Sequence, residues 1–212
     1  KIATKIMLGS KINTMNLEEA NINHFAIKEA VFPFKRFTGV DTILGPEMRS
    51  TGEVMGIDKD FGMAFAKSQI GSGSKIPTGG SVFVSVKDTD KDKILRPVSE
   101  LISLGFEIYA TDGTAEFFNK NNIKAEKINK VLQGSPHIVE MISEKKISLV
   151  FNTTETPQAI KDSKSIRRSA LESETPYYTT VSGANAAVMA IKAIRNNEMT
   201  VKTIQSFGES LN

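Results

Sequence analysis

A strand-like segment that passes directly into a helix start is the feature that most limits how this chain can fold. The mostly apolar run 106–111 ends at Thr111, turns at Asp112 and Gly113, and restarts as a helix with Thr114 in its first turn. A helix N-terminus presents unpaired backbone N–H groups, and hydroxyls on both sides of the turn suit an oxyanion such as phosphate. Threonine is also an ordinary capping residue, so this motif alone leaves both interpretations open.

A second predicted strand ends in the same way. The apolar run 147–151 is followed by Asn152, Thr153 and Thr154. Open α/β sheets bind ligands at the carboxyl ends of their parallel strands, which is where these polar residues stand. Two such ends in one sheet favour a ligand site over capping.

Strand-like and helix-like segments alternate through the second part of the chain. The predicted strands are 82–86, 106–111, 125–128, 147–151 and 177–181, and the predicted helices are 91–104, 115–120, 137–144, 165–171 and 184–195. Such alternation produces right-handed βαβ units, with helices covering both faces of a parallel sheet. We therefore predict an α/β fold with a doubly wound, parallel five-stranded sheet.

The first 75 residues have a different character. Segment 25–37 is typical of β-structure and 61–70 of a short helix, and the glycine- and serine-rich stretch 71–80 then resembles a linker. A small sheet with one helix has few layers in which to bury apolar surface. We predict two parts, 1–75 and 76–212, and expect the first to be the partial α+β remainder of a larger domain.

Composition narrows the classes of function. The chain has no cysteine, which excludes disulfides, thiol catalysis and cysteine metal sites and fits a reducing cytoplasm. The formal net charge of +3 is spread evenly, which disfavours nucleic-acid binding. No apolar run approaches the length of a membrane span, and the N-terminus lacks a signal-peptide pattern. We predict a cytoplasmic location, with neither nucleic acid nor a membrane as partner.

Four loops are predicted to leave the parallel sheet at its carboxyl edge. They span 85–91, 111–114, 129–131 and 152–154. Because such loops converge, Lys91 and Lys130 are expected to join hydroxyls and an amide around one anion, with lysine as a compact positive charge. The sequence therefore predicts a phosphate-binding site at this edge.

The same loops are poor in groups that would act as a general base. An enzyme acting on a phosphorylated substrate here needs a carboxylate or histidine within reach. Asp112 is expected to cap its own turn, and His137 stands at a helix start, where it is expected to cap or pack. The sequence holds neither a metal-ligand cluster nor a P-loop. We predict binding of a phosphorylated ligand without catalysis, and no metal site.

The order of several motifs resembles one known family. The run 45–56, Gly-Pro-Glu-Met-Arg-Ser-Thr-Gly-Glu-Val-Met-Gly, resembles the end of the second ATP-grasp domain in the large chain of the carbamoyl phosphate synthetase family. The following part resembles that family's C-terminal regulatory domain, which has a methylglyoxal-synthase-like fold. The matching stretches are 110–115, 129–131, 136–138, 152–154 and 162–171. The resemblance implies an ATP-grasp remnant over 1–75 and a regulatory domain over 76–212.

The resemblance also implies a nucleotide effector, such as UMP or IMP, at the sheet edge described above. The positions that match the family's effector residues are Ser85, Lys91, Thr111, Thr114, Lys130, Val131, Asn152 and Thr154. These positions coincide with the converging loops.

For the parent enzyme, the resemblance implies synthesis of carbamoyl phosphate from glutamine, bicarbonate and ATP, for arginine and pyrimidine synthesis. The family uses ATP with Mg or Mn and K, and its ligands for these lie upstream of Lys1, so this chain alone is expected to lack synthetase activity and to hold no cofactor. The implied partners are a glutaminase small subunit and the nucleotide effector, and homo-oligomers are left open.

Two further features concern ligands of related proteins. Some family members bind ornithine through a glutamate, which matches Glu29, and through a Tyr-Asp-Thr run. In this sequence the run reads Tyr177-Tyr178-Thr179, so a phenol replaces the aspartate. This replacement weakens the case for an ornithine site. The alternative function is methylglyoxal synthase, a lyase acting on dihydroxyacetone phosphate on this same fold. That family needs an aspartate in the loop 133–137, which here contains no acid.

Overall fold

The computed structural model describes five stretches of the chain. They are residues 1–17, 22–31, 52–129, 134–154 and 163–208. The chain divides into two compact units, one formed by 1–24 with 201–212 and the other by 25–200. Lys130 and Val131, which the sequence placed at the candidate site, and most of the motif 45–56 lie outside the described residues.

The smaller unit contains only short helical elements in its described residues. They are α1 (Ile2–Met7), the 3-10 helix η1 (Ile12–Thr14) and α9 (Ile204–Gly208). The ring of His24 lies 5.3 Å from that of Phe207, which brings the two sequence-distant segments of this unit together.

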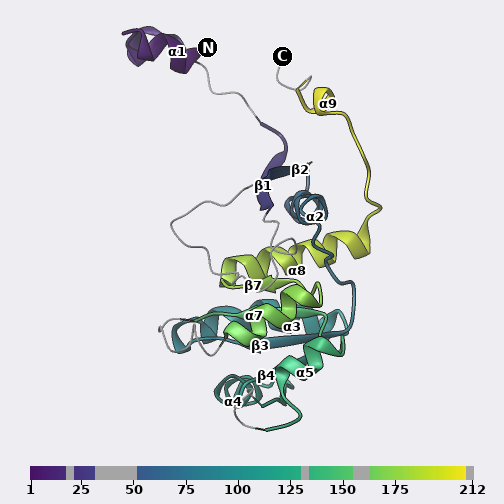
Figure 1. The fold of residues 1–212 in the computed structure, drawn as a ribbon. Coiled ribbons are helices and arrows are strands. Elements are labelled where there is room, and N and C mark those ends of the chain that lie inside the picture. The colour runs from purple at the N-terminus through teal and green to yellow at the C-terminus, as the bar shows by residue number, and fades with distance from the viewer. Residues whose placement is uncertain (18–21, 32–51, 130–133, 155–162, 209–212) are drawn as a thin grey trace. The chain divides into compact units, whose positions relative to one another are not determined.

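The larger unit holds the sheets and the longer helices (Figure 1). Its elements are β1 (Phe25–Val31), β2 (Gly52–Asp58), α2 (Phe61–Gly71), β3 (Ser81–Ser85), η3 (Asp88–Asp90), α3 (Lys91–Ser103), β4 (Glu107–Ala110), α4 (Asp112–Lys120), β5 (Glu126–Lys127), α5 (Ile138–Ser143), β6 (Leu149–Asn152), α7 (Lys164–Glu172), β7 (Tyr177–Tyr178) and α8 (Val181–Asn196).

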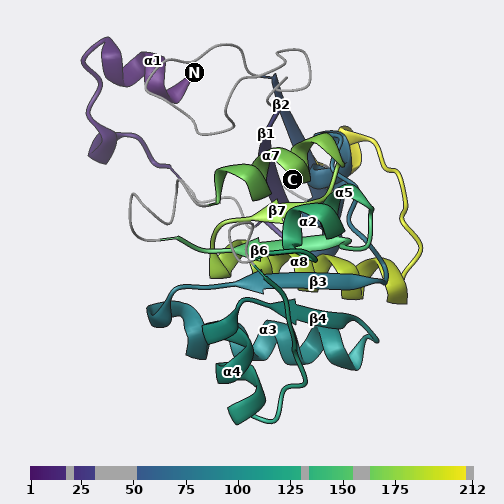
Figure 2. The same cartoon turned by 60° about the horizontal axis from the view of Figure 1, so that its bottom comes forward.

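Five of these strands form the predicted parallel sheet. Their order is β5-β4-β3-β6-β7, and every neighbouring pair is parallel. Figure 2 shows β4, β3, β6 and β7 in this sequence across the sheet. The chain runs from β3 outward to β4 and β5, and later from β6 outward to β7, so the direction of winding reverses between β3 and β6. A reversal of this kind opens a crevice at the carboxyl ends of the two strands.

Both faces of this sheet are buried, because successive side chains of a strand point to opposite sides. On β3, Val82 and Val84 pack with α3 and α8 residues in one core, while Phe83 packs with α5 and α7 residues in the other. All three are completely buried. Burial of each contributes about 1.5–3 kcal/mol. The doubly wound fold predicted from the alternating segments is confirmed.

The strands β1 and β2 form a separate antiparallel pair, with Phe25 opposite Asp58 and Val31 opposite Gly52. Helix α2 lies against this pair and also against α8. A Cβ added at Gly62 would lie 2.7 Å from the carbonyl carbon of Met189, so α2 and α8 cross with almost no space between their backbones. The boundary between 75 and 76 stays a prediction.

Three predicted element bounds were each wrong by three residues. The strand expected over 177–181 ends at Tyr178, because Thr180 caps α8 by accepting a hydrogen bond from the Gly183 N–H at 3.0 Å. The helices expected from residues 115 and 184 begin already at Asp112 and Val181. Among the described residues, none of the helices has the length and apolar character that a membrane crossing requires.

Candidate functional site

Three hydroxyl residues meet where β3 and β4 end. The Thr111 hydroxyl lies 3.3 Å from Ser85 Oγ and 3.4 Å from Thr114 Oγ1, and we name these three residues the hydroxyl cluster. Thr111 is 8% and Thr114 2% exposed, so the cluster is set into the sheet edge rather than spread over the surface. Ser85 is paired in register with Asn152 of β6, which brings a fourth predicted residue to the same edge.

The Thr111 side chain does not serve as a helix cap, although Thr111 occupies the N-cap position of α4. Its backbone carbonyl accepts from the N–H groups of Thr114 at 2.9 Å and Ala115 at 2.8 Å, as the first helical turn requires. Its hydroxyl instead points to Ser85. The structure therefore does not support a capping role for the Thr111 side chain. Its hydroxyl lies beside the N-terminus of α4, where an anion is favoured.

Two other threonine hydroxyls satisfy the backbone that follows β3. The Val86 N–H donates to Thr114 Oγ1 at 3.4 Å, and the next N–H, that of Lys87, donates to Thr153 Oγ1 at 3.1 Å. Two consecutive N–H groups after β3 therefore find acceptors in the first turn of α4 and directly after β6. Thr153 therefore organises this edge, a role that its place in the sequence does not predict.

Asn152 belongs to a polar group on the α5 and α7 side of the sheet. Its Nδ2 donates to the Tyr177 hydroxyl at 2.5 Å, and Arg167 Nη1 donates to Ser163 Oγ at 2.5 Å beside them. Burial raises the pKa of Tyr177, while the bond from Asn152 and the Arg167 charge oppose that rise. Arg167 and Ser163 were missed as neighbours of the site. Ser163 is the N-cap residue of α7 and Arg167 lies in its first turns, but the sequence did not predict which strand these two residues contact.

Lys91 stands at the start of α3 and reaches toward the N-terminus of α4. Its Nζ lies 2.7 Å from Asp88 Oδ1 and 5.8 Å from the centre of the Phe117 ring. A Cβ added at Gly113 would lie 3.6 Å from the same nitrogen. The cation is therefore held beside the turn that carries Thr111 and Thr114 of the hydroxyl cluster. Thr154, the remaining predicted residue within the described range, is half-buried directly after Thr153.

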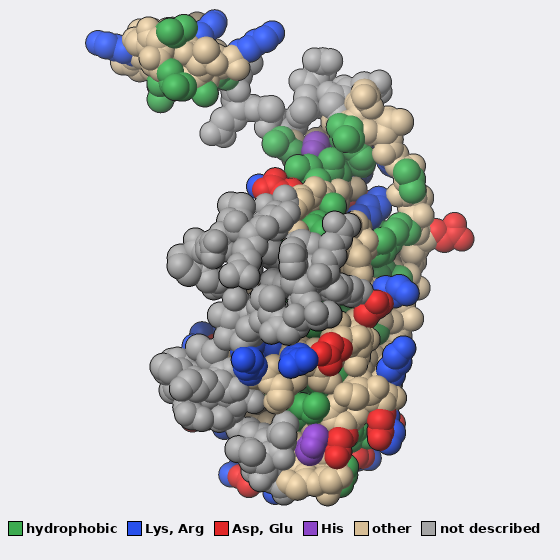
Figure 3. All heavy atoms as spheres, viewed as in Figure 1, with side chains coloured by type: hydrophobic (Ala, Val, Ile, Leu, Met, Phe, Trp, Pro, Cys, Tyr) green, Lys and Arg blue, Asp and Glu red, His purple; other side chains and the backbone are tan. Residues whose placement is uncertain are grey.

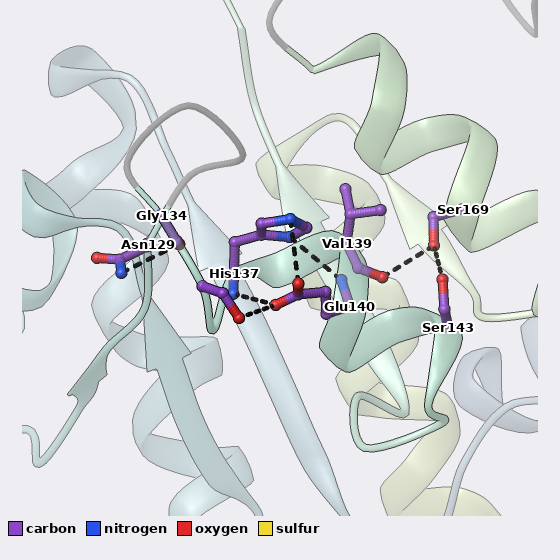
Figure 4. A network of polar contacts seen from close by, with 8 residues as sticks. Asn129, Gly134, His137, Val139, Glu140, Ser143 and Ser169 are labelled. Atoms are coloured by element: carbon purple, nitrogen blue, oxygen red, sulfur yellow. Dashed lines mark hydrogen bonds and ion pairs between the residues drawn. The ribbon is translucent and has the colours of Figure 1, made fainter.

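The two side chains considered as general bases both make structural contacts. His137 caps α5: its Nδ1 accepts from the Glu140 N–H at 3.3 Å, and the His137 N–H donates to Glu140 Oε2 at 2.9 Å (Figure 4). That backbone bond lowers the pKa of Glu140. The capping role predicted for His137 is confirmed. Asp112 was expected to cap its own turn, but its Oδ1 pairs with Lys127 Nζ, because β5 brings that lysine alongside α4.

The residues that match the family's ornithine site have different hydrogen-bond partners. Glu29 accepts a hydrogen bond from Gln69 Nε2 at 2.9 Å, whereas Tyr177 bonds Asn152 on the opposite face of the sheet from α8. Thr179 is exposed. The residue that reaches Glu29 through Gln69 is Tyr178, which replaces the family's aspartate.

Charges on the described surface are mixed. Figure 3 shows Lys and Arg side chains next to Asp and Glu side chains over the face that it draws. Glu100, for example, lies 3.0 Å from Arg96 Nε and 3.1 Å from Lys192 Nζ, and the hydrogen bond from Arg96 is the main reason that its pKa is lowered. Within the described ranges, no three His, Asp or Glu side chains gather in a way that would hold a metal ion.

Comparison with known protein families supports the class of domain that this sheet and its edge define. Residues 93–179 match the family described as the MGS-like domain. This stretch runs from α3 to the end of β7 and contains most of the candidate site.

Nearly the whole chain matches one curated protein in several organisms. It is 49% identical over 216 residues to the carbamoyl phosphate synthase large chain of Rhizobium meliloti, covering 99% of this chain and 19% of that protein. It is 51% identical over 206 residues to that of Methanobrevibacter smithii, covering 96% of this chain and 19% of the relative. The chain carries an MGS-like domain and matches the C-terminal region of carbamoyl phosphate synthase large chains.

The chain spans about a fifth of the length of these relatives. Among solved structures, the methylglyoxal synthase of Elizabethkingia anophelis is similar with a TM-score of 0.41 at 16% identity, over 54% of this chain and 80% of that one.

Proposed function

We propose that this chain is the effector-binding end of a carbamoyl phosphate synthase large chain, and that the phosphate of a nucleotide such as UMP or IMP binds at the hydroxyl cluster. The observation that carries the proposal is the Thr111 hydroxyl, which is buried at a helix N-terminus but spends no bond on capping that helix. Ser85 and Thr114 lie within 3.4 Å of it.

The chemistry of these groups matches a phosphate monoester. Hydroxyls donate to phosphate oxygens, and the N-terminus of α4 adds backbone donors and a favourable dipole. Lys91 supplies a positive charge next to the same turn. We propose that Lys130, Val131, Asn152 and Thr154 complete the site, as the family resemblance implies.

A regulatory role is favoured over a catalytic one. Asp88 pairs with Lys91, Asp112 pairs with Lys127, and His137 caps α5, so each of these candidate bases is engaged in a structural contact. Binding at the hydroxyl cluster would then change activity elsewhere in the parent enzyme by favouring one conformation over another.

For the parent enzyme we propose the activity for which the relatives are named, carried out on glutamine, bicarbonate and ATP with Mg or Mn and K. A glutaminase small subunit, a role in arginine and pyrimidine synthesis and a cytoplasmic location belong to the same proposal. No synthetase activity is expected from this chain alone, since it spans about a fifth of such a protein.

Calorimetric titration with inorganic phosphate, UMP and IMP tests the proposal. Wild-type chain should bind at least one of them saturably, and Thr111→Val should weaken that binding about tenfold or more, since a hydrogen bond to a charged group contributes about 1.5–3 kcal/mol. Thr175→Val is the matched control, because Thr175 lies before the amino end of β7, whereas the hydroxyl cluster lies at the carboxyl ends of the strands. Absence of binding by the wild type would overturn the proposal.

An enzymatic assay separates this function from methylglyoxal synthase. Purified chain incubated with dihydroxyacetone phosphate is expected to form no methylglyoxal above the background rate. Formation that is lost in Thr111→Val would replace the regulatory proposal by the catalytic one.

A further inference from the structure

The strand β7 consists of two consecutive tyrosines that point to opposite faces of the parallel sheet. Tyr177 packs against the core that contains Phe83 and Val150, and Tyr178 packs against the core that contains Phe151. The period of two along a strand makes this unavoidable. Each hydroxyl is therefore available to a different set of elements.

Tyr177 contacts the candidate phosphate site. Its hydroxyl accepts from Asn152 Nδ2 at 2.5 Å, and Asn152 is 3% exposed at the end of β6, in register with Ser85 of the hydroxyl cluster. A change in the direction of the Asn152 amide would remove or restore the bond that holds Tyr177.

Tyr178 contacts the elements that precede the sheet. Its hydroxyl donates to Gln69 Oε1 at 3.1 Å, and Gln69 Nε2 donates to Glu29 Oε2 at 2.9 Å. The orientation of the Gln69 amide is fixed, because its oxygen accepts a hydrogen bond from the Tyr178 hydroxyl while its nitrogen donates one to the Glu29 carboxylate. Burial, with the charge of Glu29 as a second cause, raises the pKa of Tyr178, so the phenol remains a donor.

The surroundings hold this connection in place. Gln69 is 6% exposed, and the Tyr178 ring lies 6.2 Å from that of Phe65 in α2 and 6.1 Å from that of Phe151 in β6. A displacement of β7 therefore cannot be absorbed by solvent around the amide. It must alter the hydrogen bonds that join Tyr178 to Gln69 of α2 and Gln69 to Glu29 of β1.

We propose that β7 couples the hydroxyl cluster to β1 and α2, through Asn152–Tyr177 on one face and Tyr178–Gln69–Glu29 on the other. The inference rests on the proposed function, since it names how occupancy of that site is communicated. Adjacent residues share one peptide plane, so a backbone displacement at one tyrosine also moves the backbone of the other. Coupling of this kind is reciprocal. If bound phosphate changes the stability of the Glu29 contact by some factor, formation of that contact changes the phosphate affinity by the same factor.

Amide hydrogen exchange of the whole chain, with and without saturating inorganic phosphate, tests the coupling. In wild type, phosphate should change the exchange rates of β1 and the second half of α2. Tyr178→Phe keeps the ring contacts and removes only the hydroxyl, and it should abolish that response while phosphate still binds. Tyr109→Phe is the matched control, since Tyr109 is the one tyrosine of the sequence outside β7, and should keep the full response.

The outcomes are distinguishable. Phosphate binding with a response that Tyr178→Phe removes and Tyr109→Phe preserves supports the coupling. Binding without a response in β1 and α2, or with a response that survives in Tyr178→Phe, overturns the coupling and leaves the proposed function standing. Absence of phosphate and nucleotide binding in wild type overturns both.

Discussion

Replacing Thr153 by valine removes one hydroxyl from the carboxyl edge without changing the shape of the side chain. Thr153 is 7% exposed, and its Oγ1 accepts from the Lys87 N–H at 3.1 Å. Loss of the acceptor leaves that donor without this bond at a partly buried position, which costs about 1–3 kcal/mol. Because valine fills the same volume, no cavity term is added.

Urea denaturation followed by circular dichroism measures this cost. Each kcal/mol lost should also lower the melting temperature by about 2–4 °C in a domain of 150–250 residues. Thr153→Ser is the control: it keeps the hydroxyl and loses one methyl group, worth about 0.8 kcal/mol. The reasoning would be refuted by a valine variant that is as stable as the wild type, or more stable than the serine variant.

Three further substitutions test other contacts of the larger unit. Gly62→Ala should lower stability by about 1–3 kcal/mol in the same urea titration, because the new Cβ meets the Met189 backbone and cannot relax through a flexible side chain; an unchanged midpoint would contradict the close crossing of α2 and α8. Burial raises the pKa of Glu29 above 4.5. The stabilisation that follows from this raised pKa is complete below pH 4.5, and it is lost as the pH rises through the pKa of Glu29 in the folded state. Glu29→Gln should therefore be more stable than wild type at pH 7 and show a flatter stability profile above pH 4.5, and equal profiles would count against this burial. His137→Ala should cost about 1 kcal/mol through loss of the α5 cap, whereas His137→Asn should retain most of it; equal losses in the two variants would argue against the capping role.

The fold was predictable because each strand–helix unit carries its own local pattern. The apolar runs that became β3 and β6 are buried on both faces, so they are continuous in the sequence and easy to recognise. Ser85, Thr111 and Asn152 could be placed at one edge for the same reason, since each follows or ends such a run. The strand predicted to reach residue 181 was too long, because the capping hydroxyl of Thr180 decides where α8 begins.

Contacts between distant segments were beyond reach of the sequence. Thr153 and Lys87 are 66 residues apart, and Tyr178 and Gln69 are 109 apart, so no local spacing relates their side chains. The approach of α2 to α8 depends on Gly62, whose lack of a side chain matters only once Met189 is seen beside it. Periodicity assigns a residue to a face, whereas the partner on that face is set by how the helices pack.

A ¹H–¹⁵N correlation spectrum of the chain, recorded during titration with inorganic phosphate and then UMP and IMP, tests most directly where a phosphorylated ligand binds. The largest chemical-shift changes should fall on the amides of Ser85, Lys91 and 111–115, with saturation at the same ligand concentration for all of them. Their loss in Thr111→Val would agree with direct contact at the hydroxyl cluster. Changes confined to α8 or the smaller unit, or a spectrum that no ligand alters, would contradict the assignment of this edge as the ligand site.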